Sequence, residues 1–358
     1  MSLQYSQGQV ETKAIDSSRY SANRSVEFSL DEKNVKYLSN MRLINLGCTA
    51  ANTPKYNQLG GAHNLLKNVT LYNGREELCS MRNAHAFLNF QETRYNNSKN
   101  RSVNNELSQS AYGYQNSVGG IRTGGGSINI SADPATTPSA FLQLSECMPL
   151  LEQVNAFDTL VFSNMRLVIE FETSPYKVIS TADAITTIEP TLLVDIVRGN
   201  MQTTQQASWL EIEHEQYNLA GKTNVGDTNP ATVHPIKKTI RLMGYDNKSV
   251  ERLLLVKQFD DVSKWGTGET VKNSSLAIYA EEFQLRINGS NVFPTTIDKD
   301  CYRQSIMADA WGELNVCEFN HKVFENDTEI DNTQNGLVDY TGCNVSQFVK
   351  DMQIEHNR

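Results

Sequence analysis

The stretch FQLRINGSNVFP, from Phe283 to Pro294, alternates apolar and polar side chains until it reaches an Asn-Gly pair. A period of two is typical of a half-buried β-strand, because successive side chains of a strand point to opposite faces. Asn-Gly favours a tight turn, since both residues tolerate positive φ angles. The stretch KNVTLYNGREEL, from Lys67 to Leu78, has the same two features. The repeat therefore predicts two similar β units in one chain.

A helical pattern follows each of these turns. SMRNAHAFLNF, from Ser80 to Phe90, places apolar residues three or four positions apart, on one face of a helix. DKDCYRQSIMADAW, from Asp298 to Trp311, has the same spacing and begins with a residue that favours the N-cap position. A strand, an Asn-Gly turn and a helix thus occur once in each half, which predicts a duplicated all-β unit.

The chain is predicted to divide into an arm and two β units. Residues 1–25 are polar and aperiodic and predict an N-terminal arm. Residues 26–178 form the first unit, which contains a long Asn-, Ser- and Gly-rich loop over residues 94–137 and a clear strand in SNMRLVIEFET, from Ser163 to Thr173. A polar linker ends near Pro190, and residues 190–358 form the second unit. Its other expected strands lie in TLLVDIV, SWLEIEHEQYNL, KKTIRLMGYD and ERLLLVKQF.

Composition indicates a globular chain and argues against a membrane span, a secretory signal and sequence-specific binding of nucleic acid. Of its 358 residues, 39% are apolar and 20% charged, and no apolar run approaches the ~18 residues needed to span a membrane. The first residues, MSLQYSQGQVETK, have no basic and apolar regions of a secretory signal. The net charge of −9 is uneven, with 14 Lys and Arg against 9 Asp and Glu in residues 1–130. No concentrated basic stripe occurs, so direct sequence-specific binding of nucleic acid is not expected.

The cysteines are too far apart for a structural zinc site, because no two are closer than sixteen residues. Several have apolar neighbours, which favours buried free thiols in a reducing compartment over disulfides. The six positions are Cys48, Cys79, Cys147, Cys301, Cys317 and Cys343.

The sequence predicts no catalytic, cofactor-binding or metal-binding residues. In WLEIEHEQY, strand alternation would separate His214 from Glu211, Glu213 and Glu215, so these side chains would not form a metal site. The glycine-rich GGIRTGGGS, residues 119–127, lacks the Gly-Lys-Ser/Thr ending of a phosphate loop, and a flexible loop is expected. The remaining histidines are isolated, and no nucleophile-elbow, zincin or kinase signature appears. These are His63, His85, His234, His321 and His356.

Two stretches resemble the double jelly-roll capsid proteins of tailless icosahedral phages with internal membranes, adenoviruses, virophages and large nucleocytoplasmic DNA viruses. EPTLLVDIVRGNMQTTQQASWLEIEHEQYNL, from Glu189 to Leu219, looks like the opening of the second jelly roll. EEFQLRINGSNVFPTTIDKDCYRQSI, from Glu281 to Ile306, looks like the later strand, Asn-Gly turn and helix. The first half matches more loosely, through Ser163 to Thr173 as a closing strand.

The resemblance implies two tandem eight-stranded jelly rolls and a structural role without catalysis or cofactor. It implies homotrimeric capsomers of pseudo-sixfold shape, located in the virion and in the host cell interior during assembly. Neighbouring capsomers and minor capsid proteins are the implied partners, and an underlying membrane is left open.

Other functions stay open alternatives. Only 47 residues follow Trp311, so either the second jelly roll is compact or the natural chain is longer. A minor capsid protein, or a vertex (penton) protein with a single jelly roll and a large insertion, is therefore an open alternative. A jelly-roll carbohydrate- or receptor-binding module would use displayed aromatics such as Tyr112, Tyr114 and Trp265. An enzyme is the third alternative.

Overall fold

The computed structural model shows two compact units built mainly from antiparallel strands. Among the described residues, those up to His214 belong to unit 1 and those from Glu215 onward to unit 2. The described residues are 9–51, 61–88, 140–179, 182–199, 201–203, 211–216, 237–242, 250–256, 282–287, 289–297, 305–306, 309–310, 340–344 and 352–357.

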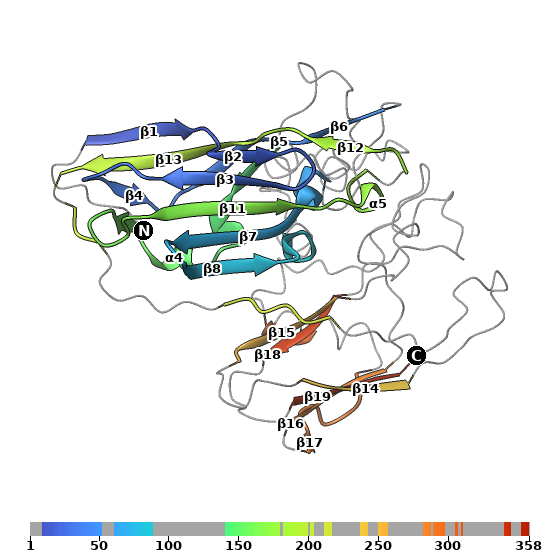
Figure 1. Ribbon diagram of the computed structural model, residues 1–358. Coiled ribbons are helices and arrows are strands. Elements are labelled where there is room, and N and C mark those ends of the chain that lie inside the picture. The colour runs from blue at the N-terminus through green and yellow to red at the C-terminus, as the bar shows by residue number, and fades with distance from the viewer. Residues whose placement is uncertain are drawn as a thin grey trace, which may run out of the picture. The chain divides into compact units, whose positions relative to one another are not determined.

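The first sheet of unit 1 is organised around β13, from Thr191 to Arg198 (Figure 1). β1 pairs with β13 along its whole length, from Gln9 with Arg198 to Ile15 with Leu192. β4 and β5 pair with different parts of β13, so both lie along its other edge, and they pair in turn with β10 and β9. The bounds are β1 Gln9–Ile15, β4 Lys36–Leu38, β5 Arg42–Leu46, β9 Ala140–Gln143 and β10 Ala156–Asp158.

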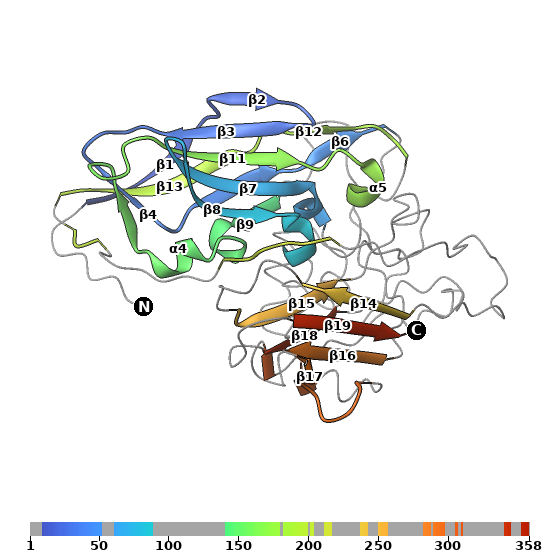
Figure 2. The same cartoon turned by 60° about the horizontal axis from the view of Figure 1, so that its bottom comes forward.

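The second sheet of unit 1 has the order β2-β3-β11-β7-β8 (Figures 1 and 2). Its central strand β11 buries Met165, Leu167, Ile169 and Phe171 on one face, as the alternation in the sequence predicts. The bounds are β2 Arg19–Ser21, β3 Ser25–Leu30, β7 Leu66–Asn73, β8 Glu76–Arg82 and β11 Met165–Phe171. A separate pair joins β6, Cys48–Ala50, to β12, Ile185–Thr187.

The two sheets of unit 1 enclose one apolar core. Inward-facing side chains of both sheets, such as Phe28, Leu71 and Ile169 from one and Leu43 and Ile196 from the other, are fully buried in a single cluster. Such packing of two twisted antiparallel sheets is the architecture of a β-sandwich. Among the described residues, the helical segments of unit 1 are η1 Gly61–Leu65, residues 84–88, η2 Leu144–Glu146, α4 Leu150–Gln153 and α5 Pro175–Val178.

Unit 2 contains a four-stranded sheet, ordered β14-β19-β16-β17, and the pair β15–β18 (Figure 2). Leu242, Leu285, Ile287, Phe293 and Ile297 form its apolar cluster. The bounds are β14 Lys237–Arg241, β15 Arg252–Val256, β16 Glu282–Ile287, β17 Ser290–Asn291, β18 Tyr340–Asn344 and β19 Met352–Asn357. Two strands, β18 and β19, therefore come from the part of the chain that follows Trp311.

The two Asn-Gly turns form in both units but differ in register. In the first, Asn73 still pairs with Glu76, so the turn consists of Gly74, at φ +62°, and Arg75. In the second, Ile287 pairs with Ser290, and Gly289 before Ser290 has φ +80°. Glycine accepts the left-handed region at either position, which is why the same dipeptide can serve two registers. In unit 1 the helix of residues 84–88 begins after β8, rather than at Ser80 as expected.

Two expected boundaries and one expected strand differ from the structure. Residues 9–21, expected in the N-terminal arm, include β1 and β2 of unit 1. β13, expected to open the second jelly roll from residue 190, pairs within the first sheet of unit 1. Residues 211–216, expected in a strand, are not in a strand. Alternation indicates that a segment is a strand, but it does not specify which sheet completes its hydrogen bonds.

Candidate assembly surface

β1 lies at the edge of the first sheet, with β13 as its partner within the described residues (Figure 1). Glu11, Lys13 and Ile15 pair with Ile196, Val194 and Leu192 in turn, which are all buried in the core, so these three residues of β1 lie on the inward face. Ile15 packs against the core, whereas on the same face of β1 Glu11 is exposed and Lys13 is half-buried. The edge strand is therefore held by ionic contacts as well as by its backbone ladder.

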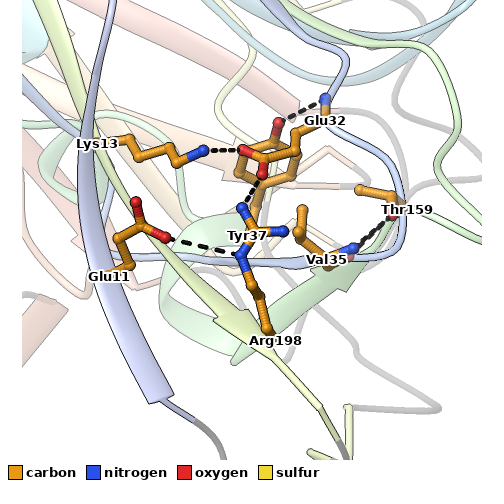
Figure 3. A network of polar contacts seen from close by, with 7 residues as sticks. All are labelled: Glu11, Lys13, Glu32, Val35, Tyr37, Thr159 and Arg198. Atoms are coloured by element: carbon orange, nitrogen blue, oxygen red, sulfur yellow. Dashed lines mark hydrogen bonds and ion pairs between the residues drawn. The ribbon is translucent and has the colours of Figure 1, made fainter.

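Glu32, in the segment between β3 and β4, is the centre of these ionic contacts (Figure 3). Lys13 Nζ donates to Glu32 Oε2 at 2.5 Å, and Arg198 at the end of β13 donates to Glu32 Oε1. Arg198 Nε also lies 3.7 Å from Glu11 Oε2. Hydrogen bonding from Lys13 lowers the pKa of Glu32, partial burial opposes this, and Arg198 adds to the lowering. The four side chains form a row of alternating charge.

Asp195 makes a second set of contacts on the outer face of the same sheet. Its carboxylate accepts hydrogen bonds from Thr12 Oγ1 at 2.5 Å, Asn40 Nδ2 at 2.5 Å and Arg42 at 2.8 Å. The residue is 8% exposed, so these donors replace water around a largely buried charge. Because Thr12 lies on β1 and Arg42 on β5, Asp195 ties three neighbouring strands together.

The loop between β10 and β11 presents two large apolar side chains to solvent. Leu160 is 77% exposed and Val161 is 69% exposed. The base of the loop is fixed, because Thr159 Oγ1 donates to Val35 O at 2.9 Å and accepts from Val35 N at 3.1 Å (Figure 3). Phe162 on the other side packs edge-on against Phe157. An ordered loop with an apolar tip can contact another protein without first losing conformational freedom.

Buried polar groups near η1 and α5 form hydrogen bonds within unit 1. Glu172 accepts hydrogen bonds from Lys177 Nζ at 3.0 Å and from Thr173 N and Ser174 N. Burial works to raise the pKa of Glu172, but Lys177 and these N–H groups outweigh it and leave the pKa lowered. Burial lowers the pKa of both His63 and His85 to about 4, so both rings are neutral at pH 7. His63 Nε2–H donates to Phe141 O at 3.0 Å.

The residues that the sequence offered as a possible metal site lie in the segment of residues 211–216. Glu211, Glu213, His214 and Glu215 are exposed, and His214 Nδ1 lies 3.0 Å from Asn83 Nδ2. Among the described residues, no group of three or more His, Cys, Asp or Glu could hold a metal ion, and no helix is long and apolar enough to cross a membrane. Residues 94–137, with Tyr112 and Tyr114, and Trp265 lie outside the described residues.

The cysteine prediction is confirmed for three positions: Cys48, Cys79 and Cys147 are buried free thiols. Burial raises the pKa of Cys79, which keeps its thiol protonated. The side chains of Cys301, Cys317 and Cys343 lie outside the described part of the chain.

Comparison with solved structures identifies the fold. The PBCV-1 protein VP54, in a crystal structure fitted into a cryo-EM reconstruction of the virophage Sputnik, has a TM-score of 0.52 and 9% identity, over 100% of this chain and 86% of VP54. The mavirus major capsid protein has a TM-score of 0.48 and 9% identity, over 100% and 84%. No protein-family model and no curated protein sequence matches the chain. The all-β chain therefore has the double jelly-roll fold that its sequence predicts.

Proposed function

We propose that this chain is a structural subunit of a viral capsid and assembles as homotrimeric capsomers of pseudo-sixfold shape. The observation that carries the proposal is the fold shared with VP54 over the whole chain. Units 1 and 2 would be the two jelly rolls, with their boundary near residues 214 and 215 rather than at 190. The sandwich of unit 1 gives a stiff wall, and the loop carrying Leu160 and Val161 gives a contact point.

The proposed role is passive, without catalysis, and its partners are copies of the same chain and minor capsid proteins. The mature protein would lie in the virion, after assembly inside the host cell. Stable subunit contacts of this kind bury well above about 2,000 Å² in total and are apolar at their centres. The loop tip of unit 1 is exposed in the single chain and suits such a contact.

The test is the mass of the purified protein in solution, measured by light scattering across a concentration series. Three chains of 40.1 kDa give a trimer of about 120 kDa, which should persist at micromolar concentration. Electron microscopy of the same sample should show particles with threefold symmetry. A stable monomer that binds immobilised glycans would instead support the carbohydrate-binding alternative, and a stable pentamer would support a vertex protein.

A further inference from the structure

We infer that the outer edge of β1 pairs antiparallel with β1 of a second copy of this chain, around a twofold axis that passes through Thr12. The inference starts from the edge itself. β1 has seven residues in continuous register with β13, without a bulge, and contains neither Pro nor Gly. Its other edge offers backbone N–H and C=O groups to solvent, within the described structure, and such an edge is a template for a further strand.

Charge selects both the partner and the register. In an antiparallel pair centred on Thr12, Glu11 of one strand lies opposite Lys13 of the other, Val10 lies opposite Ala14, and each contact occurs twice. A pair centred on Glu11 would place two carboxylates opposite each other, and one centred on Lys13 would place two ammonium groups opposite each other. The sequence VETKA, Val10 to Ala14, is thus complementary to itself in one register.

The existing ion pairs extend through such a contact without conflict. Within one copy the charges alternate from Arg198 to Glu32 to Lys13. Pairing would place Glu11 of the second copy next to Lys13, and that Glu11 already lies 3.7 Å from its own Arg198. The result is one row of alternating charges across both copies. A single inward-facing lysine normally discourages edge pairing, but here each lysine meets a glutamate.

The twofold symmetry of the contact between two β1 strands determines where in an assembly it would occur. A twofold contact joins identical surfaces, and a threefold ring has no twofold axis relating two of its own subunits. If the proposed trimer is correct, β1 therefore joins one trimer to the next and not the subunits within a trimer. The inference rests on the proposed function only for this location, because β1 could also join two copies that do not form trimers.

A cysteine placed on the axis tests the geometry. In Thr12→Cys, the two new thiols would lie opposite each other, at the Cα separation of about 4.5 to 5.5 Å found between paired strands, which a disulfide can bridge. We expect mild oxidation of the full-length protein to give a covalent dimer on a non-reducing gel. The matched control is Val10→Cys, whose new thiol on the same strand would lie opposite Ala14. Covalent dimer in both variants, or in neither, would overturn the inference.

Charge variants test the register independently. Glu11→Lys and Lys13→Glu each put like charges opposite each other when the variant pairs with itself, and we expect each to weaken association between β1 edges about tenfold. Each also disturbs its own Arg198 or Glu32 contact. Mixing the two variants leaves those internal changes in place but sets two lysines opposite two glutamates. Association should therefore return on mixing, and failure to return would contradict the inference.

Mass measurement on the same samples separates this inference from the proposed function. Trimers that form in wild type but give no Thr12→Cys cross-link would retain the proposed function and remove the β1 contact. Cross-linked dimers of a protein that forms no trimer would retain the β1 contact and remove the proposed capsomer.

Discussion

At the scale of single residues, the contacts that hold β1 depend on charge more than on apolar burial. Glu32 connects Lys13 and Arg198, and Asp195 connects Thr12, Asn40 and Arg42. The partners lie up to 183 residues apart. No local pattern in the sequence could have revealed them, because a hydrogen bond across two strands leaves no periodicity in either one.

Glu32→Gln should reduce the stability of unit 1 by about 1 kcal/mol at pH 7, the size of a partly exposed ion pair with two partners. Because the folded pKa of Glu32 is lowered from 4.5, this contribution is present above pH 4.5 and is lost as pH falls through the folded pKa. Urea unfolding at pH 7 and pH 3 measures the difference. Glu76→Gln, at an exposed position on β8, is the control. An equal loss at both pH values would contradict the charge-based explanation.

The neutral His63 predicts a second pH dependence of stability, which is caused by burial of the ring rather than by an ion pair. Burial lowers its pKa in the folded state from 6.5 to about 4, so the unfolded chain binds a proton first as pH falls. Stability should therefore decrease between pH 6.5 and pH 4 and level off below. In His63→Gln, whose amide can still donate to Phe141 O, this part of the pH dependence should disappear. An unchanged slope would mean that other groups cause it.

At the scale of elements, alternation in the sequence predicted the strands that bury apolar residues. β7 and β11 follow the expected alternation, and β14, β15 and β16 lie where strands were expected, although Gln284 on β16 is buried. β1 was missed, because its inward positions include Glu11 and Lys13 and so give no apolar period. β13 was recognised as a strand but assigned to the wrong neighbours, since its pairing with β1, β4 and β5 is a property of the whole sheet.

Asp195 gives a prediction about the attachment of β1. Asp195→Ala removes the acceptor of Arg42 and of Thr12 and should cost about 2 to 3 kcal/mol, the typical loss when a buried charged group loses its partner. Amide hydrogen exchange in residues 9–15 should rise more than exchange in β11, which lies in the other sheet. Asp195→Asn keeps one acceptor oxygen and should give a smaller change. Equal acceleration throughout unit 1 would indicate general unfolding rather than release of β1.

At the scale of the molecule, a duplicated all-β unit could be predicted because its signals occur in both halves, and the resemblance to capsid proteins implied that the two units are jelly rolls. Two Asn-Gly turns, each beside an alternating strand, gave the duplication, although the registers of the two turns differ by one residue. The exact division could not be predicted. Strand patterns stop and start at every loop, and only the pairing of β13 reveals that unit 1 continues past residue 190.

The place of β19 between β14 and β16 predicts that unit 2 depends on the last part of the chain. A chain ending at residue 345 would lack β19, so that within the described residues β14 would lose its partner strand and β16 would keep the two-residue β17 alone. We expect this truncation to abolish cooperative unfolding of unit 2 and leave that of unit 1 intact, as measured by calorimetry. A truncation that retains both transitions would show that β19 is dispensable.

The same arrangement has a consequence for synthesis on the ribosome. The chain emerges from its N-terminal end, so β14 and β16 are made before the strand that joins them. Unit 1 can close its first sheet once β13 has emerged, whereas unit 2 must wait for residues 352–357. During that interval the nascent chain carries two open strand edges, and at the high local concentration of a polysome these edges can pair with those of a neighbouring nascent chain. Slow translation of the final third would lengthen this interval and should reduce the yield of folded protein.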